Sequence, residues 1–303
     1  MRGNRKEVDK SSVKQESKYM TTQELSKLGY SISELCRCAN IARSSYYKWL
    51  NNSKTSRMKE NSIIKTEIIN IYNEVKGIYG YRRITLNLNK RFNSNYNYKR
   101  IYRLMKSMNL KSVIRKKRKK YIKSTPQITA NNKLNREFNS NNPNCKWLTD
   151  VTEFKITNGK KAYLSAILDL YDNSIVSYVL GTSNNNQLVF DTLDKAIASN
   201  PEAKPLFHSD RGFQYTNKIF KDKLNKIKAT QSMSRIGRCI DNGPMEGFWG
   251  ILKSEMYYLN KFHTYESLEQ AIYEYIEFYN TKRLQKKLKG MAPIEYRNHT
   301  LTA

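Results

Sequence analysis

Apolar and polar positions follow different patterns in the two halves of the chain. Before about residue 140, apolar residues recur every three or four positions, which is the spacing of one face of a helix. One clear example is the set Ile101, Leu104, Met105 and Met108. After about residue 144, short apolar runs are separated by turn residues, which predicts strands and shorter helices. The pattern therefore predicts an all-helical part followed by an α/β part.

The helical part divides into a polar beginning and two helical units. Residues 1–20 are polar and charged, and we expect them to be disordered. Residues 21–56 predict short helices in the outline of a helix-turn-helix, the first of them beginning at Thr21 or Thr22. An ordinary helical hairpin explains this segment equally well. Residues 57–110 predict a second helical DNA-binding unit.

Residues 141–303 predict strands and helices in a definite order. Three strands come first, and an Asn-Gly turn joins the first two as a hairpin. The expected strands are 147–156, 162–171, 175–180, one that ends at 210, and 231–234, with helices at 187–198, 218–225 and from 241 or 244 onward. This is the order of a ribonuclease-H-like α/β fold with a mixed five-stranded sheet. In that fold the first and fourth strands are central neighbours.

Positive charge is concentrated in the helical half. Residues 1–140 hold 33 Lys and Arg against 9 Asp and Glu, whereas residues 141–303 hold 22 against 17. Residues 111–140 form an expected basic linker that begins with seven positive charges in ten residues. A charge run is usually a solvated tail, but a field of this strength attracts polyanions, so we expect DNA as the partner. The alternative, a ribosomal-type or merely basic protein, leaves the low charge of the second half unexplained.

Candidate DNA contacts are basic residues on the expected helices and in the linker. The last helix of a helix-turn-helix enters a groove, and basic side chains beside an apolar helix face are free to meet phosphates. The residues expected to contact DNA are Arg43, Lys48, Arg82, Arg83, Lys99, Arg100, Arg103, Arg115, Lys116, Lys117 and Arg118.

The cysteines and the hydropathy of the chain exclude other classes of protein. Cys36 and Cys38 are too close for the usual zinc spacing, and the three histidines are remote from one another, so we expect reduced thiols and no zinc site. No apolar run has the length of a membrane span, and the N-terminus lacks an apolar signal core. We therefore expect a soluble protein that stays in the compartment where it is made.

Three acids carry the candidate chemistry: Asp150, Asp210 and Glu246. Asp150 lies in an apolar run with strand character, Asp210 follows an apolar strand, and Glu246 opens a helical stretch. Carboxylates from separate elements suit a pair of Mg²⁺ ions, because hard cations prefer oxygen ligands. Such ions activate a water or a 3′-hydroxyl and stabilise the phosphate under attack. The set indicates a metal-dependent enzyme that cuts and joins DNA.

Each acid alone has an ordinary structural explanation. Asp150 could pair with Lys146 or a nearby Arg, Asp210 stands in a good turn sequence, and Glu246 suits the first turn of a helix. The combination is harder to explain by chance. Lys253 strengthens it, because seven residues after Glu246 is two helical turns, on the same face. Glu153, Asp169 and Asp172 rank lower as ligands, and Asp241 has the character of an N-cap.

A series of motifs in this order also carries a resemblance to a known family. The motifs lie at residues 147–152, 163–170, 208–215, 232–237, 241–249, 252–255, 279–283 and 291–296, and a helical segment at 79–84 and 99–105 precedes them. They resemble the transposases of bacterial insertion sequences that have a retroviral-integrase-type core, in the branch encoded by a second reading frame. The resemblance covers about residues 60–297. Departures at Asp172-Asn173, Arg211 and Gly247 touch none of the three acids.

The resemblance implies a DDE transposase with a catalytic, metal-binding triad of Asp150, Asp210 and Glu246, and with Lys253 as its basic companion. It implies two Mg²⁺ ions, with Mn²⁺ as a substitute, and cleavage of element ends by water followed by attack of a 3′-hydroxyl on a phosphodiester. The implied partners are the element's terminal inverted repeats, target DNA, further copies of the chain on paired ends, and the upstream-frame protein. The implied location is the bacterial cytoplasm, with the nucleoid.

Two other functions compete with this interpretation. A non-catalytic DNA-binding protein or repressor of the element would use the basic half alone, but it has no need of the three acids and Lys253. A ribonuclease-H-like nuclease that cuts without joining would need the same acids, and only the resemblance favours strand transfer over it.

Overall fold

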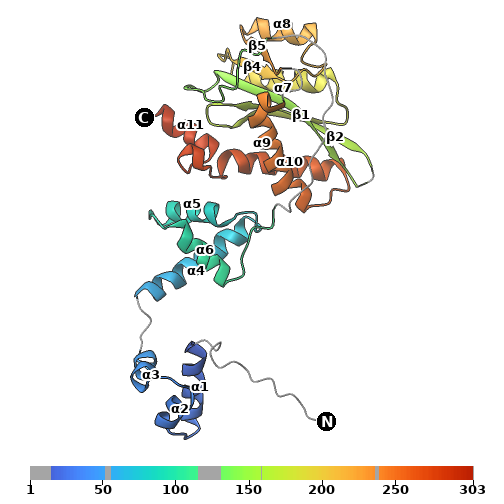
Figure 1. The fold of residues 1–303 in the computed structure, drawn as a ribbon. Helices are drawn as coiled ribbons and strands as arrows, with labels where there is room; N and C mark the ends of the chain where they lie inside the picture. Colours follow the sequence, from blue (N-terminus) through green and yellow to red (C-terminus); the bar gives the residue numbers. More distant parts are fainter. Residues whose placement is uncertain (1–14, 52–55, 115–130, 158, 236–238, 303) are drawn as a thin grey trace. The chain divides into compact units, whose positions relative to one another are not determined.

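The computed structural model describes residues 15–51, 56–114, 131–157, 159–235 and 239–302. The linker residues Arg115, Lys116, Lys117 and Arg118 lie outside this part, as do residues 1–14. The chain forms two compact units, residues 1–66 and 67–303. Figure 1 shows the elements of both.

The first unit holds three short helices and the beginning of a fourth. They are α1 (Gln15–Lys27), α2 (Ile32–Cys38), α3 (Arg43–Leu50) and α4 (Ser56–Glu74), the last of which crosses the boundary between the units. Tyr19 stacks on Trp49 at 5.5 Å between ring centroids, which ties α1 to α3. Because Tyr19 takes part in this packing, α1 begins at Gln15 and not at Thr21 or Thr22, and the expectation of disorder up to residue 20 was wrong for its last part.

The second unit begins with a helical segment. It contains the end of α4, then α5 (Tyr81–Arg91) and α6 (Tyr98–Ser107). On α4 the buried side chains are Ile64, Ile68 and Ile71, an i, i+4, i+7 stripe, whereas Ile63 and Ile69 are exposed. Buried side chains of α6 include Ile101, Leu104 and Met105, as the spacing predicted.

A five-stranded mixed sheet follows, in the order β3-β2-β1-β4-β5. The strands are β1 (Lys146–Lys155), β2 (Lys161–Asp169), β3 (Ile175–Gly181), β4 (Leu206–Ser209) and β5 (Thr230–Met233). The first three are antiparallel, and β4 and β5 run parallel to β1. This confirms the predicted ribonuclease-H-like α/β class and the neighbouring positions of the first and fourth strands.

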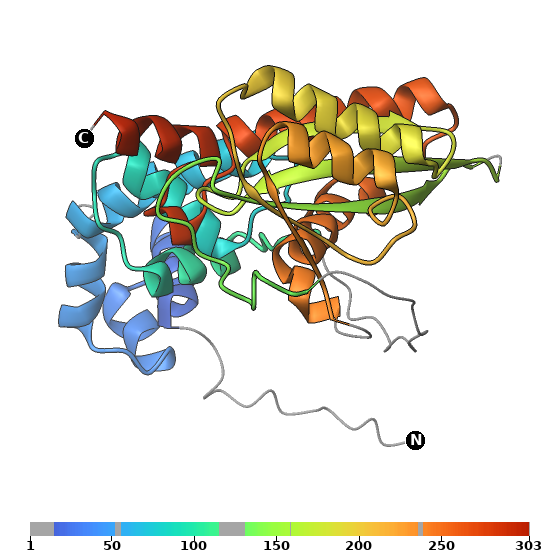
Figure 2. The same ribbon diagram turned by 90° about the horizontal axis from the view of Figure 1, so that it is seen from above.

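Helices cover both faces of the sheet. The remaining elements are α7 (Asn186–Ser199), α8 (Lys218–Lys226), η2 (Cys239–Asn242), α9 (Gly243–Glu255), η3 (Tyr257–Leu259), α10 (Tyr265–Thr281), η4 (Lys286–Leu288) and α11 (Pro293–Leu301). One core cluster joins Trp147 and other residues on one face of the sheet to α7 and α8, which lie side by side in Figure 2. A second core joins Leu148 and the opposite face to α9 and α10. Successive side chains of β1 therefore point to opposite faces of the sheet and pack into two different cores.

Among the described residues, no helix is both long enough and apolar enough to cross a membrane.

Candidate active site

The three candidate acids are delivered to one region by the parallel pairing of β1 and β4. Asp150 lies in β1, Asp210 follows the last residue of β4, and Glu246 lies in the first turn of α9. The strand register pairs Leu148 with His208, so Asp150 and Asp210 stand two residues beyond the same pair. Because the two strands are parallel, this spacing places both acids at the same end of the sheet.

Asp150 is half-buried and its carboxylate accepts two hydrogen bonds. Its Oδ1 accepts from the backbone N–H of Val151 at 2.9 Å, and its Oδ2 accepts from Nε1 of Trp249 on α9 at 3.0 Å. Burial, together with the charges of Asp210 and Glu246, raises the pKa of Asp150 to about 7 against these two hydrogen bonds. The three acids therefore interact electrostatically.

Asp210 is more exposed than Asp150, and the loop that follows it contacts its carboxylate. Packing around its carboxylate still raises its pKa, while the Gly212 N–H, which donates to Oδ1 at 2.8 Å, opposes that shift. A Cβ on residue 212 would lie 3.1 Å from Oδ1 of Asp210 and 2.8 Å from Oε1 of Gln214. Glycine at this position therefore lets the loop close tightly around the acid.

Glu246 is exposed at the beginning of α9. A Cβ at Gly247 or Gly250 would meet no atom within 4 Å, so this face of the helix is open to a large ligand. Within the described part of the chain, none of the three acids forms an ion pair with Lys, Arg or His. Within that part of the chain, the only cation that the electrostatics place near one of them is Lys253, beside Asp150.

The donor set fits divalent cations in charge and in chemistry. It consists of carboxylate oxygens, which hard cations prefer, and a bound cation would offset the burial and the neighbouring negative charges that together raise the pKa of Asp150. The side chains are not drawn together into a formed site: among the described residues, no three His, Cys, Asp or Glu side chains are grouped closely enough to hold a metal ion.

Lys253 lies two turns after Glu246 on α9 and is half-buried. Its Nζ is 5.2 Å from the centre of the Phe154 ring, a cation–π distance. Burial lowers the pKa of Lys253, and the nearby charges of Asp150 and Glu153 oppose this shift. Lys253 therefore lies near Asp150, as expected from its helical spacing, and its role toward phosphate stays a prediction.

Several supporting residues were not singled out from the sequence. Trp249 holds Asp150, and its position three residues after Glu246 on one helix was a usable signal. Asn242 donates from Nδ2 to the backbone oxygen of Thr149 at 3.0 Å, which ties the start of α9 to β1. Burial raises the pKa of Tyr215 well above its usual value, and the charges of Asp150 and Asp210 add to that effect.

Asp241 is not the expected N-cap of α9. Its side chain is fully buried and forms ion pairs with Arg136 and Arg235. The N-cap position is taken by Asn242, whose side chain makes no capping hydrogen bond. Hydrogen bonds from Arg235 and Arg136 hold the pKa of the Asp241 carboxyl far below its usual range.

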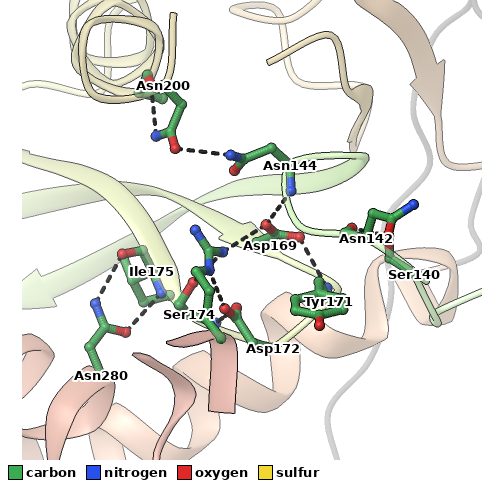
Figure 3. Close-up of polar contacts among 12 residues, drawn as sticks. Ser140, Asn142, Asn144, Asp169, Tyr171, Asp172, Ser174, Ile175, Asn200 and Asn280 are labelled. Carbon is green, nitrogen blue, oxygen red and sulfur yellow. Dashed lines mark hydrogen bonds and ion pairs between the residues drawn. The ribbon is translucent and has the colours of Figure 1, made fainter. Parts of the chain in front are cut away.

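The acids ranked below the triad have structural partners. Asp169 and Asp172 are buried where β2 ends, and both pair with Arg297 of α11 (Figure 3). Asp169 also accepts from the backbone N–H groups of Asn144 and Tyr171, at 2.7 and 3.0 Å. Burial raises the pKa of Asp169 to about 6, against these contacts. Their occupied oxygens suit an anchor for the C-terminal helix better than a metal site.

Nearby in Figure 3, Asn280 of α10 bonds to both backbone groups of Ile175, at 2.9 and 3.0 Å. The fourth acid, Glu153, pairs with Lys161 across β1 and β2 at 3.1 Å, and this hydrogen bond lowers the pKa of Glu153.

Some of the candidate DNA-binding side chains are exposed, whereas others contact residues of the protein itself. Arg43 and Lys48 are exposed on α3, and Arg82, Lys99 and Arg103 are exposed on α5 and α6.

Two other candidates have internal contacts. Arg83 pairs with the buried Glu255 at 3.1 Å and lies over the Tyr79 ring, so it joins α5 to α9 and is a poorer candidate than its neighbour Arg82. Arg100 lies over the ring of Tyr96 at 5.7 Å. Their proposed contacts with DNA stay predictions.

Comparisons with known proteins agree with this architecture. The models of two integrase core domains match residues 140–239 and 246–301, and an HTH-like domain matches residues 59–118. The putative transposase InsK for insertion sequence element IS150 of Escherichia coli is 43% identical over 272 residues, covering 89% of this chain and 95% of that protein. The transposase for insertion sequence element IS904 of Lactococcus lactis is 32% identical over 243 residues, covering 79% and 95%.

Among solved structures, the HTLV-2 integrase catalytic core domain in complex with magnesium is similar with a TM-score of 0.43 and 20% identity. The match covers 52% of this chain and 98% of that one.

The integrase core matches and the transposase relatives together make this chain a polynucleotidyl transferase of the DDE type. The extent of its identity to the curated relatives defines the group more narrowly. The chain belongs to the family of insertion-sequence transposases with an integrase core domain. The HTH-like match falls on the second helical segment, so the helix-turn-helix expected at residues 21–56 stays a prediction.

Proposed function

We propose that Asp150, Asp210 and Glu246 together hold the divalent ions of a DNA-joining centre, two Mg²⁺ with Mn²⁺ as a substitute. The observation that carries this proposal is geometric: parallel β1 and β4 bring Asp150 and Asp210 to the same end of the sheet, and Trp249 of α9, three residues after Glu246, donates to Asp150 at 3.0 Å. When bound, the ions would supply activation of the attacking oxygen and stabilisation of charge on the phosphate. Cleavage by water and strand transfer by a 3′-hydroxyl use the same arrangement.

The protein's own side chains would prepare this centre. Trp249 holds one oxygen of Asp150 at 3.0 Å and so limits its rotation. The exposed side of α9 at Glu246, Gly247 and Gly250 gives DNA backbone room to approach. Lys253, partly buried on the same helix, would hold a phosphate of the donor strand by its positive charge.

DNA is the partner of this enzyme class, and we propose that the basic half carries most of the affinity for it. Exposed Arg43, Lys48, Arg82, Lys99 and Arg103 would contact backbone phosphates or bases of the terminal inverted repeats. The seven charges at the start of the linker would add contacts without sequence preference.

We further propose that the enzyme works as a multimer on paired element ends, in the bacterial cytoplasm and associated with the nucleoid. The upstream-frame protein would act with it or be fused to it. The need for the upstream-frame protein is refuted if the purified chain alone transposes at full rate.

The experiment that tests the proposed function is cleavage and strand transfer on supercoiled DNA that carries the element's own ends, with Mg²⁺ present. Wild type is compared with Glu246→Gln, and Glu266→Gln is the matched control, because Glu266 is an exposed acid on α10. We expect Glu246→Gln to bind DNA normally and to lose both reactions, and Glu266→Gln to keep them. Wild type that binds but never reacts, even with the upstream-frame protein supplied, would favour the non-catalytic DNA-binding alternative.

A further inference from the structure

Three arginines outside the predicted site are held by hydrogen bonds on segments that adjoin the elements carrying the candidate acids. Arg211 follows Asp210 directly, and its Nε donates to the backbone oxygen of Ser234 at 2.6 Å. Arg235 is the next residue, and its Nε and Nη2 both donate to Asp241, at 2.9 and 3.0 Å. Arg136 donates from Nε to Oδ1 of Asp241 at 2.7 Å. Arg136 and Arg235 therefore share the carboxylate of Asp241, and Arg211 is bonded to the residue that precedes Arg235.

Asp241 is the anchor of this group. Its carboxylate also accepts from the backbone N–H of Arg235 at 3.0 Å and from Nδ2 of Asn132 at 2.9 Å. A fully buried carboxylate with so many donors holds its partners in one geometry. The segment that carries Arg136 is itself fixed, because Ser232 Oγ accepts from the N–H groups of Lys133 and Leu134, at 2.9 and 3.1 Å.

These contacts hold the three arginine side chains in place but do not use all of their N–H donors within the described part of the chain. The side chains of Arg136 and Arg235 are 40% and 46% exposed, and Arg211 is half-buried. A guanidinium has five N–H donors, and among the described residues each of the three uses only one or two. Within the described part of the chain, Arg136 and Arg211 donate from Nε alone and Arg235 from Nε and Nη2, which leaves each of them terminal N–H groups of the kind that bind phosphate.

The three arginines lie on segments at the same edge of the sheet as the candidate acids. Ser234 donates its N–H to the backbone oxygen of Ser209, the residue before Asp210, at 2.9 Å. Asp241 lies in η2, which leads directly into the first turn of α9 and Glu246. Three carboxylates repel a DNA strand, so a fixed positive group at the same edge would offset that repulsion.

We propose that Arg136, Arg211 and Arg235 form a binding site for DNA backbone phosphates next to the reacting phosphodiester, held in place by Asp241. The site rests on the proposed function, since it assumes that DNA is joined at this edge. Arg136 is also the last of the 19 Lys and Arg between Glu74 and Glu137, so the site continues the basic run of the linker into the catalytic domain.

The test measures DNA binding by the full chain without divalent metal, so that it does not depend on catalysis. The probe is a duplex of the element's terminal repeat, in which single phosphates near the cleavage position are replaced by neutral methylphosphonates. Arg136→Ala, Arg211→Ala and Arg235→Ala are compared with Lys195→Ala, which removes an exposed charge on α7. Arg211→Ala disturbs the fold least, because its one hydrogen bond in the described structure is to a backbone carbonyl.

We expect each arginine variant to flatten the plot of log K against log salt by about one, the value for one lost phosphate contact. It should also become insensitive to one particular methylphosphonate, which a general loss of folding would not produce. Lys195→Ala should change neither readout. Unchanged salt dependence and an unchanged methylphosphonate pattern in folded Arg136→Ala, Arg211→Ala and Arg235→Ala would overturn the proposal. Failure of strand transfer alone would count against the proposed function but not against this site.

Discussion

Removing the charge of Asp150 should make the metal-free protein more stable while destroying its activity. The wild-type carboxylate is half-buried, and its pKa is raised to about 7 by burial and by the charges of Asp210 and Glu246. Unfolding returns the pKa to its ordinary value of 3.8, so the folded state holds its proton more tightly than the unfolded state does. Stability from this group is therefore present below about pH 4 and is lost as the pH rises through 7.

The size of the effect follows from the two pKa values. A rise from 3.8 to about 7 corresponds to about 4 kcal/mol at about 1.4 kcal/mol for each tenfold change in proton affinity. An asparagine at this position would be neutral at every pH but could accept only one of the two hydrogen bonds from Val151 and Trp249, at a cost of about 1 kcal/mol. Solvent access reduces the electrostatic part further. We therefore expect Asp150→Asn to raise the free energy of unfolding by about 1–3 kcal/mol at pH 8.

The assay is urea denaturation of both proteins with EDTA at about pH 4, 6 and 8. The difference in unfolding free energy should grow with pH and be smallest near pH 4. Adding Mg²⁺ at pH 8 should stabilise the wild type more than Asp150→Asn, because the ion needs the carboxylate. A destabilised Asp150→Asn at pH 8 without metal, or a difference that does not depend on pH, would refute this reasoning.

Two further predictions concern residues around the centre. Arg297→Met should destabilise the protein by about 3–5 kcal/mol in urea denaturation, because it leaves the buried Asp169 and Asp172 without their guanidinium partner. A change below about 1 kcal/mol would show that the ion pairs of Arg297 are not a structural anchor. If Lys253 holds a donor phosphate, Lys253→Met should keep DNA binding but lower the rate of strand transfer at least tenfold in a single-turnover assay, which corresponds to about 1.4 kcal/mol in the activation barrier. An unchanged rate would show that Lys253 has no role in the joining centre.

The order of the elements, and the pairing of the two strands that carry Asp150 and lead to Asp210, were predictable from the sequence. From residue 146 to the start of α9, the strand and helix boundaries agree with expectation to within one or two residues, because the Asn-Gly turn and the apolar runs are strong local signals; no bounds were predicted for α10 and α11. The spacing of Glu246 and Lys253 placed them on one helix, and β1 and β4 are neighbours as the fold class required.

Contacts between residues remote in sequence were not predictable. Nothing local distinguishes Arg83, which pairs with Glu255 across 172 residues, from Arg82, which is exposed. Asp241 had the local character of an N-cap, and only the folded chain brings Arg136 to it. Side chains of this kind are chosen by tertiary packing, which sequence periodicity does not encode.

The measurement that tests the central claim most directly is a metal switch at Asp210. Thiolate is a poor ligand for Mg²⁺, which is bound through oxygen, whereas Mn²⁺ accepts sulfur more readily. Strand transfer by Asp210→Cys is therefore measured with each ion, beside wild type. We predict that Asp210→Cys binds DNA, is inactive with Mg²⁺ and regains part of its activity with Mn²⁺. Activity with Mg²⁺ equal to that of wild type would contradict the assignment of Asp210 as a metal ligand of the joining centre.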